Sequence, residues 1–418
     1  MRRIPLLLTA VVLTLAAAPQ APAAPGVKFG LTDDAWLVSG PGTLDSRLAK
    51  LDVLGVHVVR FTLRWDRIAR TQPTAPTDPS DPAYNWTATD PVLDGLRQHG
   101  IEVVLQLVGT PGWANGGRAS NYVPTTSDTF GAFASAAAHQ YPWVRRWVIW
   151  NEPNQVRWLR PTTAPIYTVR LLNPAYAAIH SVIRGALVAG GGTAPRGSTG
   201  GVSPLAWLAG MHAAHARLDA YAHNPYPLDP KRETPLTGGC GHCTTVTMAT
   251  IGHFVSLVGR DFPTARIWLT EYGYQSSPPD HLLGVPLALQ ARYVAEGAYV
   301  AYRTPKVDML IHFLYRDEPD IARFQSGLVT LTNAVKPAYA AFQLPLAQIS
   351  RSTLWGQLRA PTAGSTARIE KQVGSGWQTI ATVHASAAGY FRWSGTLVRG
   401  ERVRVRAASL VGATLTIH

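Results

Sequence analysis

The sequence predicts an α/β protein, a (β/α)8 TIM barrel followed by a small C-terminal all-β sandwich domain. Three observations lead to this prediction. Between residues 27 and 344, short β-branched apolar runs alternate with longer stretches of helical length and periodicity. Eight of the short runs can be picked out, and eight parallel strands close a barrel. After Pro345 the helical periodicity stops, and short alternating runs separated by Gly or Ser follow.

The N-terminus has the composition of an export signal. Met1-Arg2-Arg3 precedes an apolar run over residues 4–18, and small residues just before position 25 suit a cleavage site. We therefore expect a secreted, extracellular protein in which residues 1–24 are a signal peptide, 25–345 the barrel and 346–418 an accessory β-sandwich. No later stretch approaches the roughly eighteen apolar residues that a membrane span requires, so we expect no span.

Each expected strand of the barrel is a short apolar run that ends in polar residues. In chain order the eight runs are Val27–Leu31, His57–Leu63, Glu102–Leu107, Val144–Trp150, Ala186–Ala189, Leu218–Ala222, Arg266–Thr270 and Met309–Phe313. Between them, helical length and periodicity mark Leu44–Leu54, Thr129–Gln140, Asn173–Arg184, Thr247–Val258 and Ala288–Tyr302. The fifth run is the weakest prediction, because three glycines, Gly190 to Gly192, follow it at once and are interpreted as a loop.

The region after Pro345 is expected to form a small antiparallel sandwich. Its predicted strands are Arg368–Val373, Trp377–Val383, Tyr390–Trp393, Arg402–Ala407 and Ala413–Ile417. Trp355, Trp377 and Trp393 either fill its core or form a binding platform, and core packing is the favoured interpretation.

Two carboxylates stand at strand ends, where the chemistry of such barrels is found. Glu152 follows the fourth strand in Trp-Asn-Glu-Pro-Asn, and Glu271 ends the seventh in Thr-Glu-Tyr-Gly. Strands four and seven lie three positions apart around an eight-stranded ring, so both side chains can reach the barrel mouth. Retaining cleavage of a glycosidic bond needs two carboxyl groups about 5 to 5.5 Å apart across the anomeric carbon. The placement suits such a pair.

These motifs resemble those of the clan A-type (β/α)8-barrel retaining glycoside hydrolases, a superfamily that includes cellulases and β-xylosidases. The resemblance spans residues 27–344, and the closest sequence similarity is confined to the motifs at the strand ends. It implies a retaining glycosidase that cleaves O-glycosidic bonds of a poly- or oligosaccharide by double displacement, with Glu152 as acid/base and Glu271 as nucleophile. It implies no cofactor.

Further positions match substrate-binding residues of that clan. Arg60 on the second strand resembles the arginine that favours the charged form of the nucleophile, although it could be only a structural ion-pair partner. Asn151 resembles the residue that hydrogen-bonds the sugar 2-hydroxyl. His223 and Tyr226, after the sixth strand, resemble a His and a Tyr beside the two carboxylates. A satisfied core histidine is the alternative for His223.

Aromatic residues at strand ends are candidates for stacking on sugar rings. Many members of the clan end strand eight with a Trp, whereas here Phe313 or Tyr315 must take that place. Among the tryptophans near strand ends, Trp113 is the one that we expect to bind substrate. More broadly, rim positions are expected for Trp65, Trp113, Trp150 and Trp158, with core packing as the alternative for each.

Several acidic residues near strand ends receive a structural interpretation. Asp33 and Asp34 follow the first strand and are expected to form a loop or to cap a helix. Asp317 and Glu318 are interpreted as loop charges or subsite contacts. We find no His-Glu-x-x-His or calcium-loop pattern, and therefore expect no metal site.

The two cysteines, Cys240 and Cys243, are expected to form a local disulfide in an exported protein. A redox-active pair is disfavoured, because the motif lies in the middle of the chain after Pro- and Gly-rich sequence. A zinc site that uses His242 is the remaining alternative.

The net charge is +13, and 32 of the 38 basic residues are Arg, scattered along the chain. Zinc-finger spacings and RNA-binding signatures are missing, so we expect no nucleic-acid partner. The charge suits an anionic or envelope-derived glycan. Two alternatives stay open: a catalytically silent glycan-binding barrel and a transglycosylase that uses the same residues. Linkage, endo or exo action and oligomeric state are not predicted.

Overall fold

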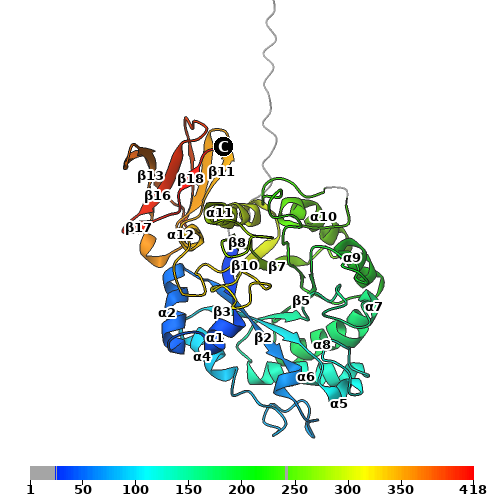
Figure 1. Cartoon of the computed structure of the whole chain (residues 1–418). Helices are drawn as coiled ribbons and strands as arrows, with labels where there is room; N and C mark the ends of the chain where they lie inside the picture. The colour runs from blue at the N-terminus through cyan, green and yellow to red at the C-terminus, as the bar shows by residue number, and fades with distance from the viewer. Residues whose placement is uncertain (1–23, 25, 241–242) are drawn as a thin grey trace, which may run out of the picture.

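The computed structural model describes residues 24, 26–240 and 243–418, and Figure 1 shows a barrel ringed by helices. Eight parallel strands close in the order β1-β10-β7-β6-β5-β4-β3-β2. They are β1 Lys28–Thr32, β2 Val58–Arg64, β3 Glu102–Val108, β4 Arg146–Ile149, β5 Leu187–Thr193, β6 Ala220–His223, β7 Arg266–Tyr272 and β10 Val307–Phe313. Each overlaps a strand predicted from the sequence, so the predicted (β/α)8 TIM barrel is confirmed.

Helices cover the outside of the barrel. The principal ones are α2 Leu44–Leu54, α4 Asp90–Gln98, α6 Ser127–Gln140, α8 Asn173–Val182, α9 Pro204–Ala213, α10 Ile251–Asp261, α11 Leu287–Arg303 and α12 Pro337–Gln343. Shorter helices are α1 Asp34–Ser39, α3 Trp65–Ile68, α5 Gly112–Asn115 and α7 Ala164–Tyr167. Within the described residues, no helix is long and apolar enough to cross a membrane.

The interior of the barrel is an apolar plug with a polar layer above it. The plug comprises Val58, Val104, Val148, Ala189, Ala220, Ala222, Trp268, Met309 and Ile311. The polar layer consists of the residues two positions after Val58, Val104, Ala222 and Trp268, which are Arg60, Gln106, Asn224 and Thr270. Alternate residues of a strand point to the same face, so these polar side chains stack directly on the plug at the carboxyl ends of the strands.

The prediction of a loop at Gly190 to Gly192 is wrong, because all three lie in β5. A Cβ on Gly190 would lie 2.6 Å from the Leu172 side chain, and one on Gly191 would lie 2.7 Å from the ring of Tyr221. Gly191 also has a φ of +89°, which disfavours any side chain. The strand therefore needs glycine where a sequence pattern would expect β-branched residues.

The C-terminal region is an all-β unit, as predicted, and Figure 1 places it in orange and red beside α11 and α12. One sheet contains β11 Leu346–Ser350, β12 Thr353–Gln357 and β15 Tyr390–Ser394. The other contains β13 Thr366–Val373, β14 Gly376–His384, β16 Arg402–Ala407, β17 Leu410–Val411 and β18 Leu415–Thr416. The buried side chains between the sheets include Leu354, Ile369, Phe391, Val403 and Val405.

The β unit is fixed to the barrel by aromatic packing. Trp355 is fully buried, with its ring centroid 5.5 Å from Tyr299 and 5.4 Å from Tyr302 on α11. Trp355 is thus a packing residue, but it belongs to the core of the barrel and not to that of the sandwich. The guanidinium of Arg359 lies between the rings of Phe29 and Phe342, at 3.9 and 4.6 Å from their centroids.

Cys240 and Cys243 form a disulfide in the loop between β6 and α10. The alternative interpretation was a zinc site that uses His242, and this residue lies outside the described residues. Among the described residues no group of three or more His, Cys, Asp or Glu side chains could hold a metal ion.

Candidate active site

Glu152 and Glu271 meet at the mouth of the barrel. Glu271 lies within β7 and is 7% exposed, whereas Glu152 lies just beyond β4 and is partly buried. Burial, and next the negative charge of Glu271, raise the pKa of Glu152 to about 7. A carboxyl group with such a pKa can hold a proton near neutral pH and give it up during a reaction.

The backbone at Glu152 adopts a conformation that side-chain-bearing residues rarely take. Its φ is +40°, and that of Trp150 is +71°. Such angles cost on the order of 1 kcal/mol or more and persist only where surrounding contacts impose them. Here Glu152 N donates to Gly192 O at 2.8 Å, and Trp150 N donates to Leu107 O at 2.9 Å. Contacts with the neighbouring strands thus fix the direction of the Glu152 side chain.

Asn224 positions the carboxyl group of Glu152, a role that sequence analysis missed. Its Nδ2 donates to Glu152 Oε1 at 3.2 Å, and its Oδ1 accepts from Thr270 Oγ1 at 2.8 Å. Asn224 is 1% exposed, so its amide is fixed by these contacts. Its donated hydrogen bond stabilises the charged form and partly opposes the raised pKa of Glu152. The sequence feature that could have identified Asn224 is its position directly after β6.

Glu271 has a different environment from that of Glu152. Arg60 Nη1 lies 2.8 Å from Glu271 Oε1 in a buried ion pair, and the Tyr226 hydroxyl donates to Glu271 Oε2 at 3.0 Å. Burial and the negative charge of Glu271 raise the pKa of Tyr226 well above its usual value, so the phenol keeps its proton as a donor. Both contacts stabilise a carboxylate anion. The structure therefore brings together Glu271, Arg60 and Tyr226, as the resemblance implied.

A row of polar side chains crosses the barrel mouth from β4 to β1. Gln106 Nε2 donates to Asn151 Oδ1 at 3.2 Å, and Gln106 Oε1 accepts from Thr62 Oγ1 at 3.3 Å. Thr62 N in turn donates to Asp34 Oδ1 at 3.3 Å. The row fixes the side chain of Asn151 beside Glu152, and sequence analysis did not identify Gln106 as a part of it.

Asp33 and Asp34 have separate functions. Asp33 is the N-cap of α1 and accepts from Trp36 N at 3.1 Å, as expected. Asp34 is a third carboxyl group near the ion pair of Arg60 and Glu271. Burial raises its pKa, the positive charge of Arg60 opposes this, and the negative charge of Glu271 adds to it. The expected role as a helix cap therefore holds for Asp33. Asp34 instead lies close enough to Arg60 and Glu271 to interact with their charges.

His223 does not face the cleft, which corrects its assignment as a substrate-binding residue. It is fully buried. Its Nε2 lies 3.1 Å from Val246 O, and its Nδ1 lies 2.8 Å from Thr193 Oγ1. Because a carbonyl only accepts, Nε2 carries the proton and Nδ1 accepts from Thr193. Burial lowers the pKa of His223 to about 4, which describes a satisfied core histidine.

At the end of β10, Phe313 and not Tyr315 faces the site. Tyr315 is 5% exposed and stacks on Trp36 with centroids 3.9 Å apart. Phe313 is partly exposed and packs edge-on against Tyr226 and Phe324, at 6.3 and 4.9 Å between centroids. Of the two substitutes considered for the clan's Trp, the structure thus favours Phe313. Phe324 was not identified from the sequence.

The four tryptophans expected at the rim divide into two pairs. Trp65 and Trp150 are core residues, 0% and 1% exposed, so the rim prediction is wrong for both. Trp113 and Trp158 are partly exposed. Trp113 Nε1 donates to Ala69 O at 2.8 Å, which fixes the orientation of its ring.

The loop that carries Phe324 is held by a buried ion pair. Lys336 Nζ lies 2.6 Å from Asp317 Oδ1, and both side chains are at most 2% exposed. Glu318 Oε2 accepts from Phe324 N at 2.9 Å. Of the two roles considered for Asp317 and Glu318, the structure shows the loop role, since both shape the segment beside Tyr226.

The sequence matches no protein-family profile and none of the curated proteins compared with it. Its fold is similar to that of solved glycoside hydrolases. A family 39 glycoside hydrolase from Bacteroides cellulosilyticus WH2 is 17% identical with a TM-score of 0.58, over 90% of this chain and 82% of that chain. A monomeric β-xylosidase from Caulobacter crescentus CB15 is 14% identical with a TM-score of 0.56, over 94% and 96%.

A β-glucuronidase from Bacteroides uniformis is 14% identical with a TM-score of 0.52, over 94% of this chain but only 45% of that chain. At these identities the similarity establishes the fold, a (β/α)8 barrel with a C-terminal β domain. The fold predicted from the sequence is thereby confirmed.

Proposed function

We propose that this protein is a secreted retaining glycoside hydrolase that cleaves O-glycosidic bonds of a poly- or oligosaccharide. The observation that carries the proposal is the unequal environment of two neighbouring carboxyl groups. Glu271 is held by a cation and a phenol, whereas burial and the charge of Glu271 raise the pKa of Glu152 to about 7. Paired carboxyl groups that differ in this way divide into a nucleophile and an acid.

In the first step, a carboxylate oxygen of Glu271 attacks the anomeric carbon and forms an ester to the sugar. The bond from that carbon to the leaving oxygen breaks, and its electron pair takes the proton of Glu152. As Glu271 loses its charge, Arg60 and the Tyr226 hydroxyl remain beside it and stabilise it again as it departs. Asn151 Oδ1 accepts from Gln106, which leaves Asn151 Nδ2 to donate to the 2-hydroxyl of the sugar.

In the second step, Glu152 acts as a base. It removes a proton from a water molecule, whose oxygen attacks the anomeric carbon and displaces Glu271. Two inversions leave the configuration unchanged. If a sugar hydroxyl replaces the water, the same residues perform transglycosylation, so product analysis separates the two reactions.

The expected substrate is a β-linked, anionic glycan. Solved structures of similar fold include a β-xylosidase and a β-glucuronidase, which suggests a β-linked glycoside. The signal-like N-terminus and the net charge of +13 favour an extracellular glycan that is anionic or derived from the cell envelope.

The test is hydrolysis of a panel of aryl glycosides and polysaccharides, with the anomer first released followed by proton NMR. We expect turnover of at least one substrate with retained configuration, and loss of activity by orders of magnitude in Glu271→Gln. Release of the inverted anomer would contradict the double displacement. Tight glycan binding without turnover of any substrate would favour the silent barrel instead.

A further inference from the structure

Three consecutive loops beside Glu152 have an unusual charge composition. They span residues 109–126 after β3, 150–163 after β4 and 194–203 after β5. Glu152 itself is their only acidic residue. The same loops carry four arginines, here called the arginine rim: Arg118, Arg157, Arg160 and Arg196.

The arginine rim is exposed and uncompensated. All four side chains are exposed, and none forms an ion pair with a carboxylate of the described residues. Elsewhere in this chain, exposed arginines such as Arg260 and Arg266 do pair with aspartates. Like charges within a Debye length of about 8 Å repel each other, so a concentration of them favours an anionic ligand.

Backbone contacts hold the three loops together. Arg160 N donates to Asn121 O at 2.8 Å, and Val123 N donates to Arg160 O at 3.0 Å, which joins the first loop to the second. Asn154 Nδ2 donates to Val202 O at 2.9 Å, which joins the second loop to the third. The arginine rim is therefore carried by a connected surface and not by independent loops.

Aromatic rings orient three of the four guanidinium groups. The ring centroid of Tyr122 lies 5.3 Å from Arg118 and 5.9 Å from Arg160. Arg157 lies 5.6 Å from the centroid of Trp158. Stacking on a ring leaves the N–H donors at the edge of a guanidinium free for a carboxylate or a sulfate.

One arginine of the rim, Arg157, lies near the proposed acid/base Glu152. Arg157 is close enough to Glu152 for its positive charge to favour the ionised form of that carboxyl group. Because Glu152 gives its proton to the leaving oxygen, the part of the substrate that leaves must lie on this side of the cleft. On the nucleophile side the loop after β10 is mixed in charge, since Arg323 lies 3.7 Å from Glu318 and 3.9 Å from Asp320.

We propose that the arginine rim binds the acidic groups of a polysaccharide on the leaving-group side of the cleft. The groups are carboxylates of uronic acids or sulfate esters, both of which match the paired donors of arginine. This inference rests on the proposed function for its placement of the leaving group, and it adds the residues that would bind the acidic groups and the side of the cleft on which they lie.

The test is equilibrium binding of labelled oligosaccharides of equal length by the full chain carrying Glu271→Gln, so that bound sugar is not cut. The probes are an oligoglucuronate, a sulfated cello-oligosaccharide and a neutral cello-oligosaccharide, all β-1,4-linked, so that they differ in charge and not in linkage. We expect at least one acidic probe to bind about tenfold more tightly than the neutral probe, equivalent to about 1.4 kcal/mol. Replacing all four arginines of the rim by Gln should abolish that difference.

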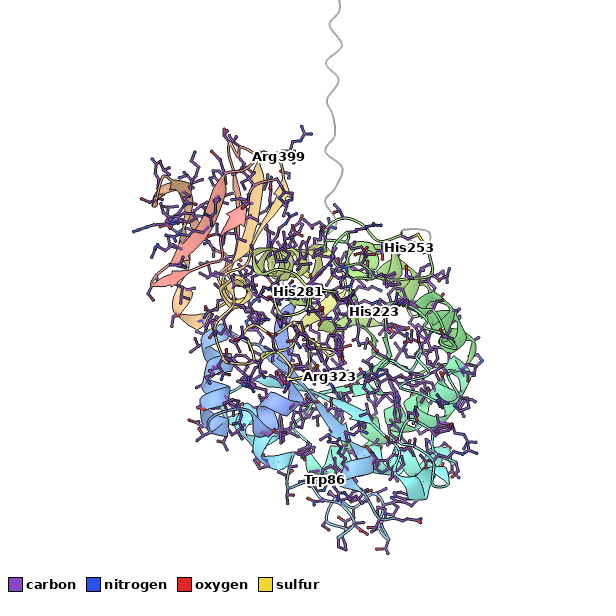
Figure 2. All side chains as sticks on the ribbon, in the orientation of Figure 1. Trp86, His223, His253, His281, Arg323 and Arg399 are labelled. Carbon is purple, nitrogen blue, oxygen red and sulfur yellow. A yellow bond between two sulfur atoms is a disulfide. The ribbon has the colours of Figure 1, made fainter. Side chains whose placement is uncertain are left out.

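The matched control removes four exposed arginines of the C-terminal domain: Arg351, Arg392, Arg399 and Arg402, each changed to Gln. It lowers the net charge by the same amount at a distance from the cleft, as the position of Arg399 in Figure 2 shows. We expect its affinities to stay within about twofold of the parent chain, because screening at physiological salt limits such charges to about 8 Å.

The outcomes separate the sources of the acidic group. A preference for the oligoglucuronate that depends on the arginine rim identifies carboxylates as the acidic groups. A rim-dependent preference for the sulfated cello-oligosaccharide identifies sulfates, and either result supports the proposal. Equal binding of neutral and acidic probes, equal losses in both quadruple variants, or equally tight binding of an oligothymidylate of the same charge overturns it. Turnover of glycosides without rim-dependent binding overturns only this inference, whereas rim-dependent binding without any turnover overturns only the proposed function.

Discussion

Glu152→Ala is expected to lower kcat/KM by about 10²- to 10⁴-fold on a glycoside with a poor leaving group, the usual contribution of general acid catalysis. On a dinitrophenyl glycoside the first step needs no proton, so its rate should change little. Azide, a nucleophile that needs no base, should then restore turnover and yield a glycosyl azide of retained configuration. Steady-state kinetics on both substrates, with and without azide, measure this.

The same variant should change the pH profile. The pKa of Glu152 is raised to about 7, so its acid form is present below that value and is lost as the pH rises through it. The kcat/KM of the wild type should therefore fall above about pH 7, and Glu152→Ala should lose this limb. Glu401→Ala, a change far from the cleft, serves as the control. Equal losses on good and poor leaving groups would contradict the assignment of Glu152.

Lys336→Met is expected to destabilise the protein by about 3 to 5 kcal/mol, because it leaves the carboxylate of Asp317 buried without its cation. The control is Lys371→Met, which removes a partly exposed partner of Glu401 and should cost at most about 1 kcal/mol. Urea-induced unfolding followed by tryptophan fluorescence compares the two.

A double variant, Lys336→Met with Asp317→Leu, should recover most of the lost stability, since apolar side chains often replace a buried ion pair at little cost. The loop between these residues carries Phe324, so the single variant should also impair substrate binding. Similar losses for Lys336→Met and Lys371→Met would show that the buried pair contributes no more than an exposed one.

The barrel could be predicted from the sequence because its periodic signal is repeated eight times. β5 was the exception, since its glycines are required by contacts with Leu172 and Tyr221 that no local pattern reveals. In the C-terminal domain, β11 and β12 were missed because they lie directly after the barrel, before the alternation becomes regular. Local periodicity therefore identified the strands only where close packing did not dictate the residues.

The site was predictable as far as the motifs extended. Arg60, within β2, and Tyr226, just after β6, contact Glu271 as the resemblance implied. Asn224 and Gln106 were missed, since an amide near a strand end has no pattern of its own. His223 and Tyr315 were misplaced because the sequence does not show which way a side chain turns at a strand end.

The most direct test of the central claim is to trap the covalent intermediate. A 2-deoxy-2-fluoro glycoside with a dinitrophenyl leaving group slows the second step more than the first, so the sugar should accumulate on the enzyme. Mass spectrometry of proteolytic fragments should then find one added sugar on the peptide that contains Glu271, and none in Glu271→Gln. Label on a different carboxylate, or hydrolysis without any adduct, would contradict the assignment of Glu271 as the nucleophile.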